Sequence, residues 1–298
     1  MSRRSSLSPQ SPVPSPQSSV LSPRSSMLLH CGSFRLDLSR PLVMGIVNVT
    51  PDSFSDGGRH LLRDTAIAHA QQLIAEGADL LDIGGESTRP GAQTVSVQQE
   101  LDRVLPVIEG LYGVSVPLSI DTCKPEVMRA ALAAGVSMVN DINALQQAEA
   151  LAAVVASNAA VCLMHKQGQP QTMQLQPHYQ DVLSEVMDFL RTRIAAVEAA
   201  GVARDRIVAD PGFGFGKTLA HNLTLLRDLD KFSELGVPLL AGLSRKSMLG
   251  VITGQGVEHR VSASVAAALL AVQRGASIVR VHDVRATCDA LKIWQSVR

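Results

Sequence analysis

Short apolar runs alternate with longer amphipathic segments along most of the chain. Helical spacing marks the longer segments, for example Arg63–Glu76, Pro125–Ala134, Asp181–Ala200 and Arg260–Arg274. Eight aliphatic and β-branched runs are predicted as buried strands: Leu42–Asn48, Asp79–Ile83, Pro117–Asp121, Ser137–Asp141, Ala160–Met164, Arg206–Asp210, Pro238–Gly242 and Ser277–His282. Eight strand–helix units in about 250 residues predict an α/β fold, the (β/α)8 TIM barrel.

Glycine follows several of the predicted helices, just before the next strand. A glycine there suits the left-handed backbone that ends a helix, and it occurs at Gly77, Gly135, Gly201, Gly236 and Gly275. A doubly wound open sheet is the alternative architecture. The number of strands and the absence of G-x-G-x-x-G after the first strand favour the barrel.

The first 26 residues differ in composition from the rest. They hold eleven Ser, five Pro and no acidic residue, so they cannot bury enough apolar surface to fold. We therefore expect a disordered tail over residues 1–26 and one catalytic domain over residues 27–298. A transit peptide is an alternative for the tail, although the prolines and the lack of an amphipathic period speak against it.

Composition excludes several classes of protein. With 27 Lys+Arg against 27 Asp+Glu the formal net charge is zero, and only nine residues are Phe, Trp or Tyr. These values argue against a basic, base-stacking nucleic-acid binder. No stretch is apolar enough for a membrane-spanning helix. Four widely spaced cysteines form neither a zinc motif nor a disulfide framework, which predicts a reducing compartment, the cytoplasm.

Polar residues stand where nearly every predicted strand ends. In such barrels the catalytic residues lie at the carboxyl ends of the strands. A single polar residue there is as readily structural as functional, but eight strand ends converging on one rim indicate a pocket. The residues are Asn48, Glu86, Asp121, Asn140, Asp141, His165, Asp210, Ser244, Arg245, Lys246, Arg280 and His282.

The charges at this rim divide into two groups. Arg280 and His282 lie two apart on one strand and so share a face, where with Asn48 they form a candidate phosphate or pyrophosphate site. Asp121, Asn140 and Asp210 offer acceptors that suit a flat heterocycle with several N–H groups. Two structural alternatives stay open: Asp121 as the N-cap of the following helix, and Lys246 as a surface lysine at a helix start.

Two loops rich in glycine and proline, Thr50–Gly58 and Gly84–Ala92, are long for this fold and lack apolar periodicity. We interpret both as closing loops over the pocket. Phe54 favours this role for the first loop, since a phenylalanine is unusual in an ordinary solvated loop.

Seven segments resemble the signature segments of the dihydropteroate synthase family. They occur in order between Leu42 and Lys292: MGIVNVTPDSFSDGG, LLDIGGESTRPGA, SIDTCKPEVM, VNDINAL, VADPGFGFGKTLAHN, GLSRKSMLG and IVRVHDV. The resemblance implies a transferase of folate biosynthesis. Such an enzyme joins 4-aminobenzoate to 6-hydroxymethyl-7,8-dihydropterin pyrophosphate and gives 7,8-dihydropteroate and pyrophosphate. It further implies Mg²⁺ as cofactor, a homodimer and inhibition by sulfonamides.

The resemblance also implies roles for particular residues. The pterin would be held by Asp121, Asn140, Asp210 and Lys246, and the pyrophosphate by Arg280, His282 and Asn48, with Asn48 near the Mg²⁺. The 4-aminobenzoate would be framed by Thr88, Arg89, Pro90, Phe213 and Ser247. Phe54 and Asp56 belong to the closing first loop. Catalytic roles fall to Asp121, Lys246, Arg280, His282 and Asp56.

Two other readings remain open at this point. One is a barrel that binds methyltetrahydrofolate for methyl transfer, which would need no pyrophosphate site. The other is a non-catalytic paralogue that binds pterin; its one support is Lys166, an unusual residue after the fifth strand.

The synthase reaction is expected to be dissociative, with pyrophosphate leaving early and no strong general base.

Overall fold

The computed structural model describes residues 28–50, 59–87, 94–169 and 172–297. The predicted tail lies outside these residues, as do most of the two predicted closing loops. Among the described residues, no helix combines the length and the apolar character needed to cross a membrane.

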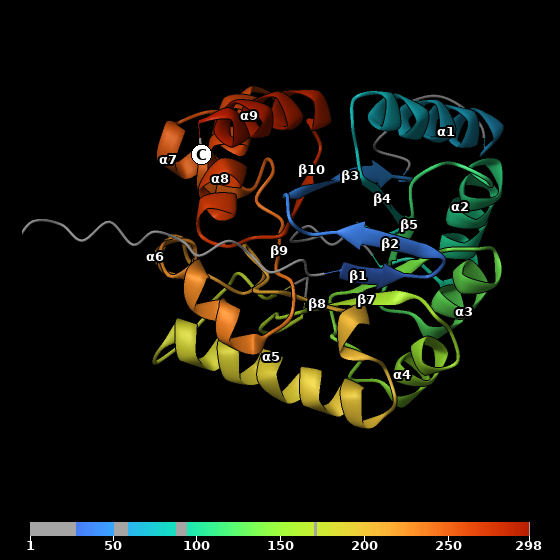
Figure 1. Ribbon diagram of the computed structural model, residues 1–298, viewed down its shortest axis with the longest axis horizontal. Coiled ribbons are helices and arrows are strands. Elements are labelled where there is room, and N and C mark those ends of the chain that lie inside the picture. Colours follow the sequence, from blue (N-terminus) through green and yellow to red (C-terminus); the bar gives the residue numbers. More distant parts are fainter. Residues whose placement is uncertain (1–27, 51–58, 88–93, 170–171, 298) are drawn as a thin grey trace, which may run out of the picture.

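Eight parallel strands form the barrel (Figure 1). They are β3 (Leu42–Asn48), β4 (Leu80–Gly84), β5 (Leu118–Asp121), β6 (Met138–Asp141), β7 (Ala160–Met164), β8 (Ile207–Asp210), β9 (Leu240–Ala241) and β10 (Ile278–Val281). Each strand pairs with its neighbours in chain order, and β10 pairs with β3. A bridge between Ala209 and Leu239 joins β8 to β9 and closes the ring. The predicted barrel is confirmed, and the open-sheet alternative is wrong.

Helices surround the barrel in alternation with the strands. They are α1 (Arg59–Ala75), α2 (Val97–Gly110), α3 (Pro125–Ala133), α4 (Ala148–Val155), α5 (Val182–Ala199), α6 (Leu219–Arg227), α7 (Ser247–Thr253), α8 (Val261–Gln273) and α9 (Val284–Ser296). Short 3-10 turns occur at η2 (Arg204–Arg206), η3 (Leu229–Leu235) and η4 (Val257–His259). The five glycines predicted to end helices all have positive φ, between 66° and 105°.

The strands differ from their predicted bounds mainly at β9. Pro238–Gly242 was expected there, and only Leu240–Ala241 keeps strand geometry. Pro238 has no backbone N–H to give to a ladder, but its carbonyl accepts the Ala209 N–H at 2.9 Å and so holds β8 beside it.

Side chains inside the barrel change from apolar to polar along the strands. Because side chains alternate on a strand, Leu80, Asp82 and Gly84 of β4 face inward while Leu81 and Ile83 pack against the helices. Toward the amino ends the interior is an apolar cluster that includes Leu42, Met44, Leu80, Met138, Cys162, Val208, Leu240 and Ile278. The carboxyl half of the interior carries the polar residues.

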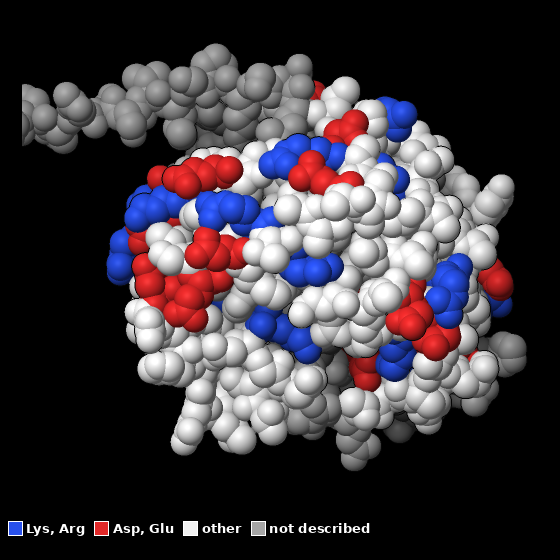
Figure 2. All heavy atoms as spheres, turned by 90° about the horizontal axis from the view of Figure 1, so that it is seen from below, with Lys and Arg blue, Asp and Glu red and all other residues white. Residues whose placement is uncertain are grey.

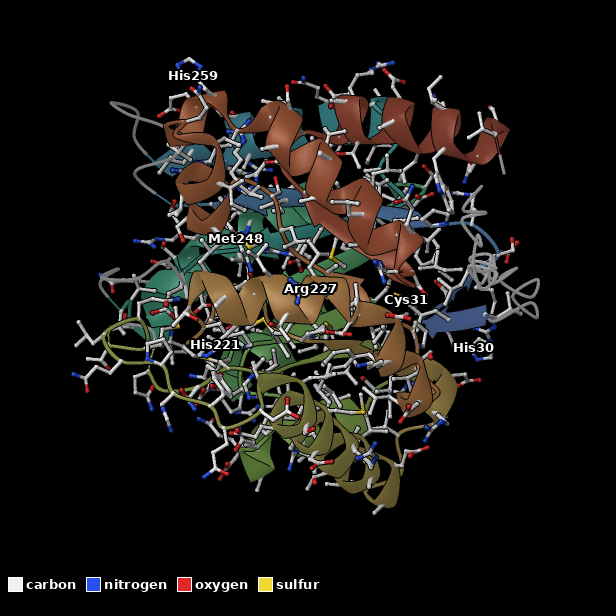
Figure 3. All side chains as sticks on the ribbon, turned by 90° about the vertical axis from the view of Figure 1, so that its left-hand side faces the viewer. His30, Cys31, His221, Arg227, Met248 and His259 are labelled. Carbon is white, nitrogen blue, oxygen red and sulfur yellow. The ribbon has the colours of Figure 1, made fainter. Side chains whose placement is uncertain are left out.

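A hairpin that the sequence analysis did not predict covers the amino end of the barrel. Its strands are β1 (Leu28–Cys31) and β2 (Phe34–Asp37), paired antiparallel. Leu29 and Cys31 are fully buried and belong to the apolar cluster inside the barrel. In Figure 3, His30 and Cys31 of the hairpin lie at one end of the molecule, and His221 lies toward the opposite end. The hairpin therefore covers the end of the barrel opposite the carboxyl ends of the strands.

Charged side chains of both signs are mixed over the face shown in Figure 2. This pattern agrees with the balanced composition.

Candidate active site

Arg280 of β10 is the centre of the polar layer inside the barrel. Its Nε donates to Asp82 Oδ2 at 2.5 Å, and its Nη2 donates to Asp121 Oδ2 at 2.7 Å. The Asp82 side chain is completely buried, and 12% of the Asp121 side chain is exposed. Strands β10, β4 and β5 thus place one cation between two carboxylates, which fixes the plane of the guanidinium.

Burial raises the pKa of Asp121 to about 7; Arg280 opposes this rise and the nearby Asp82 adds to it. The same two carboxylates raise the pKa of Arg280, although burial acts against them. Asp121 is not the N-cap of α3. Lys124 occupies the cap position, and the Thr122 side chain accepts its N–H at 3.2 Å. The capping alternative for Asp121 is therefore wrong.

Asn140, at the end of β6, is the amide of this layer. It is 4% exposed, and its Nδ2 donates to Asp82 Oδ2 at 2.9 Å. Its Oδ1 has no hydrogen-bond partner among the described residues. The amide therefore presents an unoccupied acceptor within the polar layer.

Asp210 and Lys246 form a second charged group, at the ends of β8 and β9. Asp210 Oδ1 accepts the Gly212 N–H at 2.7 Å, and burial raises the pKa of Asp210. Lys246 Nζ donates to the Phe213 carbonyl and lies 4.7 Å from the centroid of the Phe215 ring. Burial lowers the pKa of Lys246 to about 8, against the attraction of Asp210. Lys246 is the N-cap residue of α7, yet its side chain turns toward the loop after β8, where it contacts Phe213 and Phe215. The surface alternative is therefore wrong.

His282 and Ser244 connect the ends of β10 and β9. The Ser244 Oγ lies 3.0 Å from His282 Nδ1 and accepts the His282 backbone N–H at 3.2 Å. Between Ser244 and Lys246, Arg245 has a left-handed backbone with φ of 57°. Its side chain pairs with Asp283 at 2.5 Å, which holds this strained turn against the last strand.

The remaining predicted residues are placed as follows. Ser247 begins α7 and is exposed, and Asn48 ends β3 and is half-buried. The Phe213 ring is completely buried in the cluster outside the barrel, so its carbonyl rather than its ring reaches Lys246. Phe54, Asp56, Thr88, Arg89 and Pro90 lie outside the described residues.

Two buried residues were missed by the sequence analysis. Asp82 interrupts an apolar run at an inward position, and a charge in the middle of a buried strand was the available signal. Lys217 is 3% exposed and lies 2.9 Å from both His165 Nδ1 and the Gly212 carbonyl. Burial lowers the pKa of Lys217 to about 7 and that of His165 to about 3. Lys217 ties the loop after β8 to the end of β7.

A further ion cluster anchors the base of the loop after β4. Lys124 Nζ contacts Glu86 Oε2 at 2.7 Å and the completely buried Glu100 at 2.5 Å. Glu86 Oε1 accepts the Val95 N–H at 3.0 Å, so one side chain connects the two ends of that loop. Glu86 therefore shapes the rim without entering the polar layer around Arg280.

The donor set limits what metal the pocket can bind. Among the described residues, no group of three or more His, Cys, Asp and Glu side chains is arranged to hold a metal ion. Asn48 supplies one amide oxygen at the rim. Mg²⁺ commonly takes few protein ligands and completes its shell with phosphate oxygens and water, so this set fits an ion shared with a phosphate substrate.

Comparisons with known proteins show the family of the chain. The family described as pterin binding enzyme matches residues 44–282. A dihydropteroate synthase of Neisseria meningitidis serogroup C is 53% identical over 271 residues, which cover 89% of this chain and 96% of the relative.

Solved structures are similar over nearly the whole barrel. The Xanthomonas albilineans dihydropteroate synthase with 4-aminobenzoic acid has a TM-score of 0.87 and 57% identity, covering 92% of this chain and 98% of that chain. The enzyme of the same organism in complex with 7,8-dihydropteroate has a TM-score of 0.82 and 54% identity, covering 91% and 98%.

Proposed function

The chain belongs to the pterin-binding enzyme family, with dihydropteroate synthases as its relatives, and we propose that it catalyses their reaction. It joins 4-aminobenzoate to 6-hydroxymethyl-7,8-dihydropterin pyrophosphate and releases 7,8-dihydropteroate and pyrophosphate. The observation that carries this proposal is the layer of acceptors and cations inside the carboxyl end of the barrel, centred on Arg280. A barrel for methyl transfer needs no cationic group of this kind, and the relatives named above favour neither alternative reading.

The pterin ring lies among the acceptors of the interior. Asp121, Asn140 and Asp210 accept from its N–H groups, and Lys246 donates to a ring acceptor. The three acceptor side chains are each anchored by a neighbour: Asp121 by Arg280, Asn140 by Asp82, and Asp210 by the Gly212 N–H. Anchored groups lose little freedom on binding, which favours a defined orientation of the reacting methylene.

The pyrophosphate lies at the rim near Arg280, His282 and Asn48. Nε and Nη2 of Arg280 are occupied by carboxylates, and no acceptor among the described residues binds Nη1. Ser244 holds the His282 ring in place through Nδ1, which keeps the imidazole at the rim beside the anion. Asn48 would hold a Mg²⁺ ion together with the phosphate oxygens; when bound, this ion neutralises part of their charge.

The bond between the pterin methylene and the pyrophosphate oxygen breaks, and its electron pair leaves with the pyrophosphate. Arg280 and His282 stabilise that developing negative charge. The electron-rich ring and the carboxylates of Asp121 and Asp210 offset the positive charge left on the methylene. The amine nitrogen of 4-aminobenzoate then forms the C–N bond and loses a proton to solvent water. An aromatic amine is already neutral at pH 7, so no strong base is needed.

The 4-aminobenzoate binds near Ser247, and Thr88, Arg89 and Pro90 stay predicted contacts outside the described residues. The predicted Phe213 contact is not part of the proposal, because its ring is completely buried in the cluster outside the barrel. Sulfonamides share its aromatic amine and its anionic end, and we include inhibition by sulfonamides in the proposal. Phe54 and Asp56 of the first loop stay predicted site residues, since they lie outside the described residues.

Product identification tests the function. Purified chain with both substrates and Mg²⁺ should yield dihydropteroate, detected by mass spectrometry. Neither the reaction without 4-aminobenzoate nor the Asp210→Asn variant should give comparable product. Formation of a different pterin product would refute the proposal.

We also propose a homodimer that forms through α7, α8 and α9, which lie together in Figure 1. Large apolar side chains are exposed there: Val251 at 69%, Leu270 at 50% and Ile293 at 70%. Light scattering should give twice the chain mass, and Leu270→Glu should give monomers. Tyr112→Glu, on the connection between α2 and β5, is the control that should leave the dimer intact.

A cytoplasmic location completes the proposal. All four cysteines are free thiols, as expected in a reducing compartment. Cell fractionation with an antibody to the chain tests this directly.

A further inference from the structure

Asp82 is a completely buried carboxylate whose side-chain partners are two residues of the proposed site. Its Oδ2 accepts from Arg280 Nε at 2.5 Å and from Asn140 Nδ2 at 2.9 Å. Its Oδ1 has no partner among the described residues. A buried ion pair contributes little stability compared with an apolar pair of similar volume, so stability alone gives a weak reason for an acid at this position.

The shared oxygen determines which end of the Asn140 amide faces the pocket. Arginine has donors and no acceptor, so Asp82 Oδ2 must act as an acceptor toward Arg280. The same oxygen is therefore an acceptor toward Asn140 as well, and only the NH₂ end of the amide can face it. The carbonyl end, Oδ1, is turned away and remains unpartnered in a residue that is 4% exposed.

This orientation has a chemical consequence for the ligand. An amide can rotate to offer either a donor or an acceptor, and a pterin edge with N–H groups requires the acceptor. Asp82 lies inside the barrel on β4, where it is paired in register with Ser119 of the neighbouring β5. Asn140 lies on β6, the next strand after β5. The side chains inside the barrel thus fix the orientation of the Asn140 amide before a ligand binds.

We propose that Asp82 is a positioning residue, which holds the amide of Asn140 so that its carbonyl oxygen faces the pterin. The inference deepens the proposed function and rests on it. Arg280 has a second role in this arrangement. Because its guanidinium can only donate, Asp82 Oδ2 has to act as an acceptor.

Two substitutions separate the acceptor from the charge. Asp82→Asn removes the charge but keeps one carbonyl oxygen that can accept from both Arg280 and Asn140. Asp82→Leu has the same branching and removes the charge and the acceptor together. Ser119→Ala is the matched control, because it removes a buried polar group beside Asp82 and leaves both hydrogen bonds in place.

The experiment measures the Kd of 6-hydroxymethylpterin and of inorganic pyrophosphate by calorimetry, on chains checked for folding by circular dichroism. Asp82→Leu should weaken pterin binding about tenfold or more, as expected for the loss of one buried hydrogen bond. Asp82→Asn and Ser119→Ala should stay within about threefold of the wild type. Pyrophosphate should bind no more weakly to either Asp82 variant, since both lose a negative charge beside Arg280.

A double-mutant cycle tests whether Asp82 acts through Asn140. In an Asn140→Ala background, Asp82→Leu should cause no further loss of pterin affinity. Equal behaviour of Asp82→Asn and Asp82→Leu, equal weakening of both ligands, or additive losses in the cycle would each overturn the proposal. If Asp82→Leu does not fold, Asp82→Ala makes the same comparison with less bulk.

The wild-type chain keeps this result separate from the proposed function. Dihydropteroate formation by the wild type, together with unaltered pterin binding in Asp82→Leu, refutes only the role of Asp82. Failure of the wild type to form dihydropteroate refutes the function itself.

Discussion

Replacing Arg280 with Met should destabilise the fold in a manner that depends on pH. Arg280 lies between Asp82 and Asp121, and these three side chains are 21%, 0% and 12% exposed. Removal of one partner from a buried ion pair costs about 3–5 kcal/mol, because the remaining charge stays buried without compensation. The low exposure of all three groups places the expected loss in that range.

Protonation of Asp121 sets the pH dependence. Its pKa is raised to about 7 by burial, and Arg280 is the group that opposes the rise. Without Arg280 the pKa moves higher still. A carboxyl group with a raised pKa stabilises the fold at low pH, and this contribution is lost as the pH rises through the folded-state pKa. Above pH 7 the contribution of Asp121 to the free energy of unfolding has largely reached its lower limit in the wild type. In the variant this free energy still falls, by up to about 1.4 kcal/mol per pH unit.

Urea unfolding at pH 6, 7 and 8 measures this difference. The gap in free energy of unfolding between wild type and Arg280→Met should widen from pH 7 to pH 8. The control is Arg40→Met, which breaks a two-contact pair with Asp79 at the other end of the barrel, where Arg40 is 55% exposed. That loss should be about 0–1 kcal/mol. A gap for Arg280→Met that stays constant or narrows as the pH rises would show that Arg280 does not hold down the pKa of Asp121.

Three further predictions address the loops around the site. Gly201→Ala should lower the free energy of unfolding by roughly 1–2 kcal/mol, because its φ is positive. Gly212→Ala should lower it several times more, since a Cβ there would also meet the His165 carbonyl oxygen. Equal losses in urea unfolding would contradict this. Burial lowers the pKa of Lys217 to about 7, so Lys217 is protonated less readily in the folded than in the unfolded chain. The free energy of unfolding of the wild type should therefore increase between pH 7.5 and 9.5. Lys217→Met should lack this rise, and parallel pH curves for the two proteins would contradict the argument. Ser244→Ala should raise the KM for pterin pyrophosphate about tenfold by releasing His282, with little change for 4-aminobenzoate; equal changes in both constants would speak against it.

The barrel was predictable because its signals are local. Strand period, helix period and glycines with positive φ each leave a mark within a few residues, and the predicted run Ala160–Met164 has the same bounds as β7. The hairpin β1–β2 was missed because its eight strand residues mix apolar and polar side chains. Its burial comes from contact with the barrel interior, which is distant in sequence.

The polar residues at the strand ends were predicted, but the hydrogen bonds and ion pairs between them were not. Arg280, Asp121, Asn140 and Asp210 were expected at the rim, and the structure brings Arg280 to Asp121 over a separation of 159 residues. Asp82 was treated as part of a strand, because inward and outward positions cannot be assigned until the register of the neighbouring strands is known. The register aligns Asp82 with Ser119 and thereby assigns it to the interior.

Pyrophosphate release, measured with and without 4-aminobenzoate, decides whether the chain catalyses the dihydropteroate synthase reaction. The purified chain would be supplied with pterin pyrophosphate and Mg²⁺, and pyrophosphate and dihydropteroate would be measured in the same reaction. We expect release that depends on 4-aminobenzoate, with one dihydropteroate formed for each pyrophosphate. A folded chain that binds both substrates and releases no pyrophosphate would contradict it.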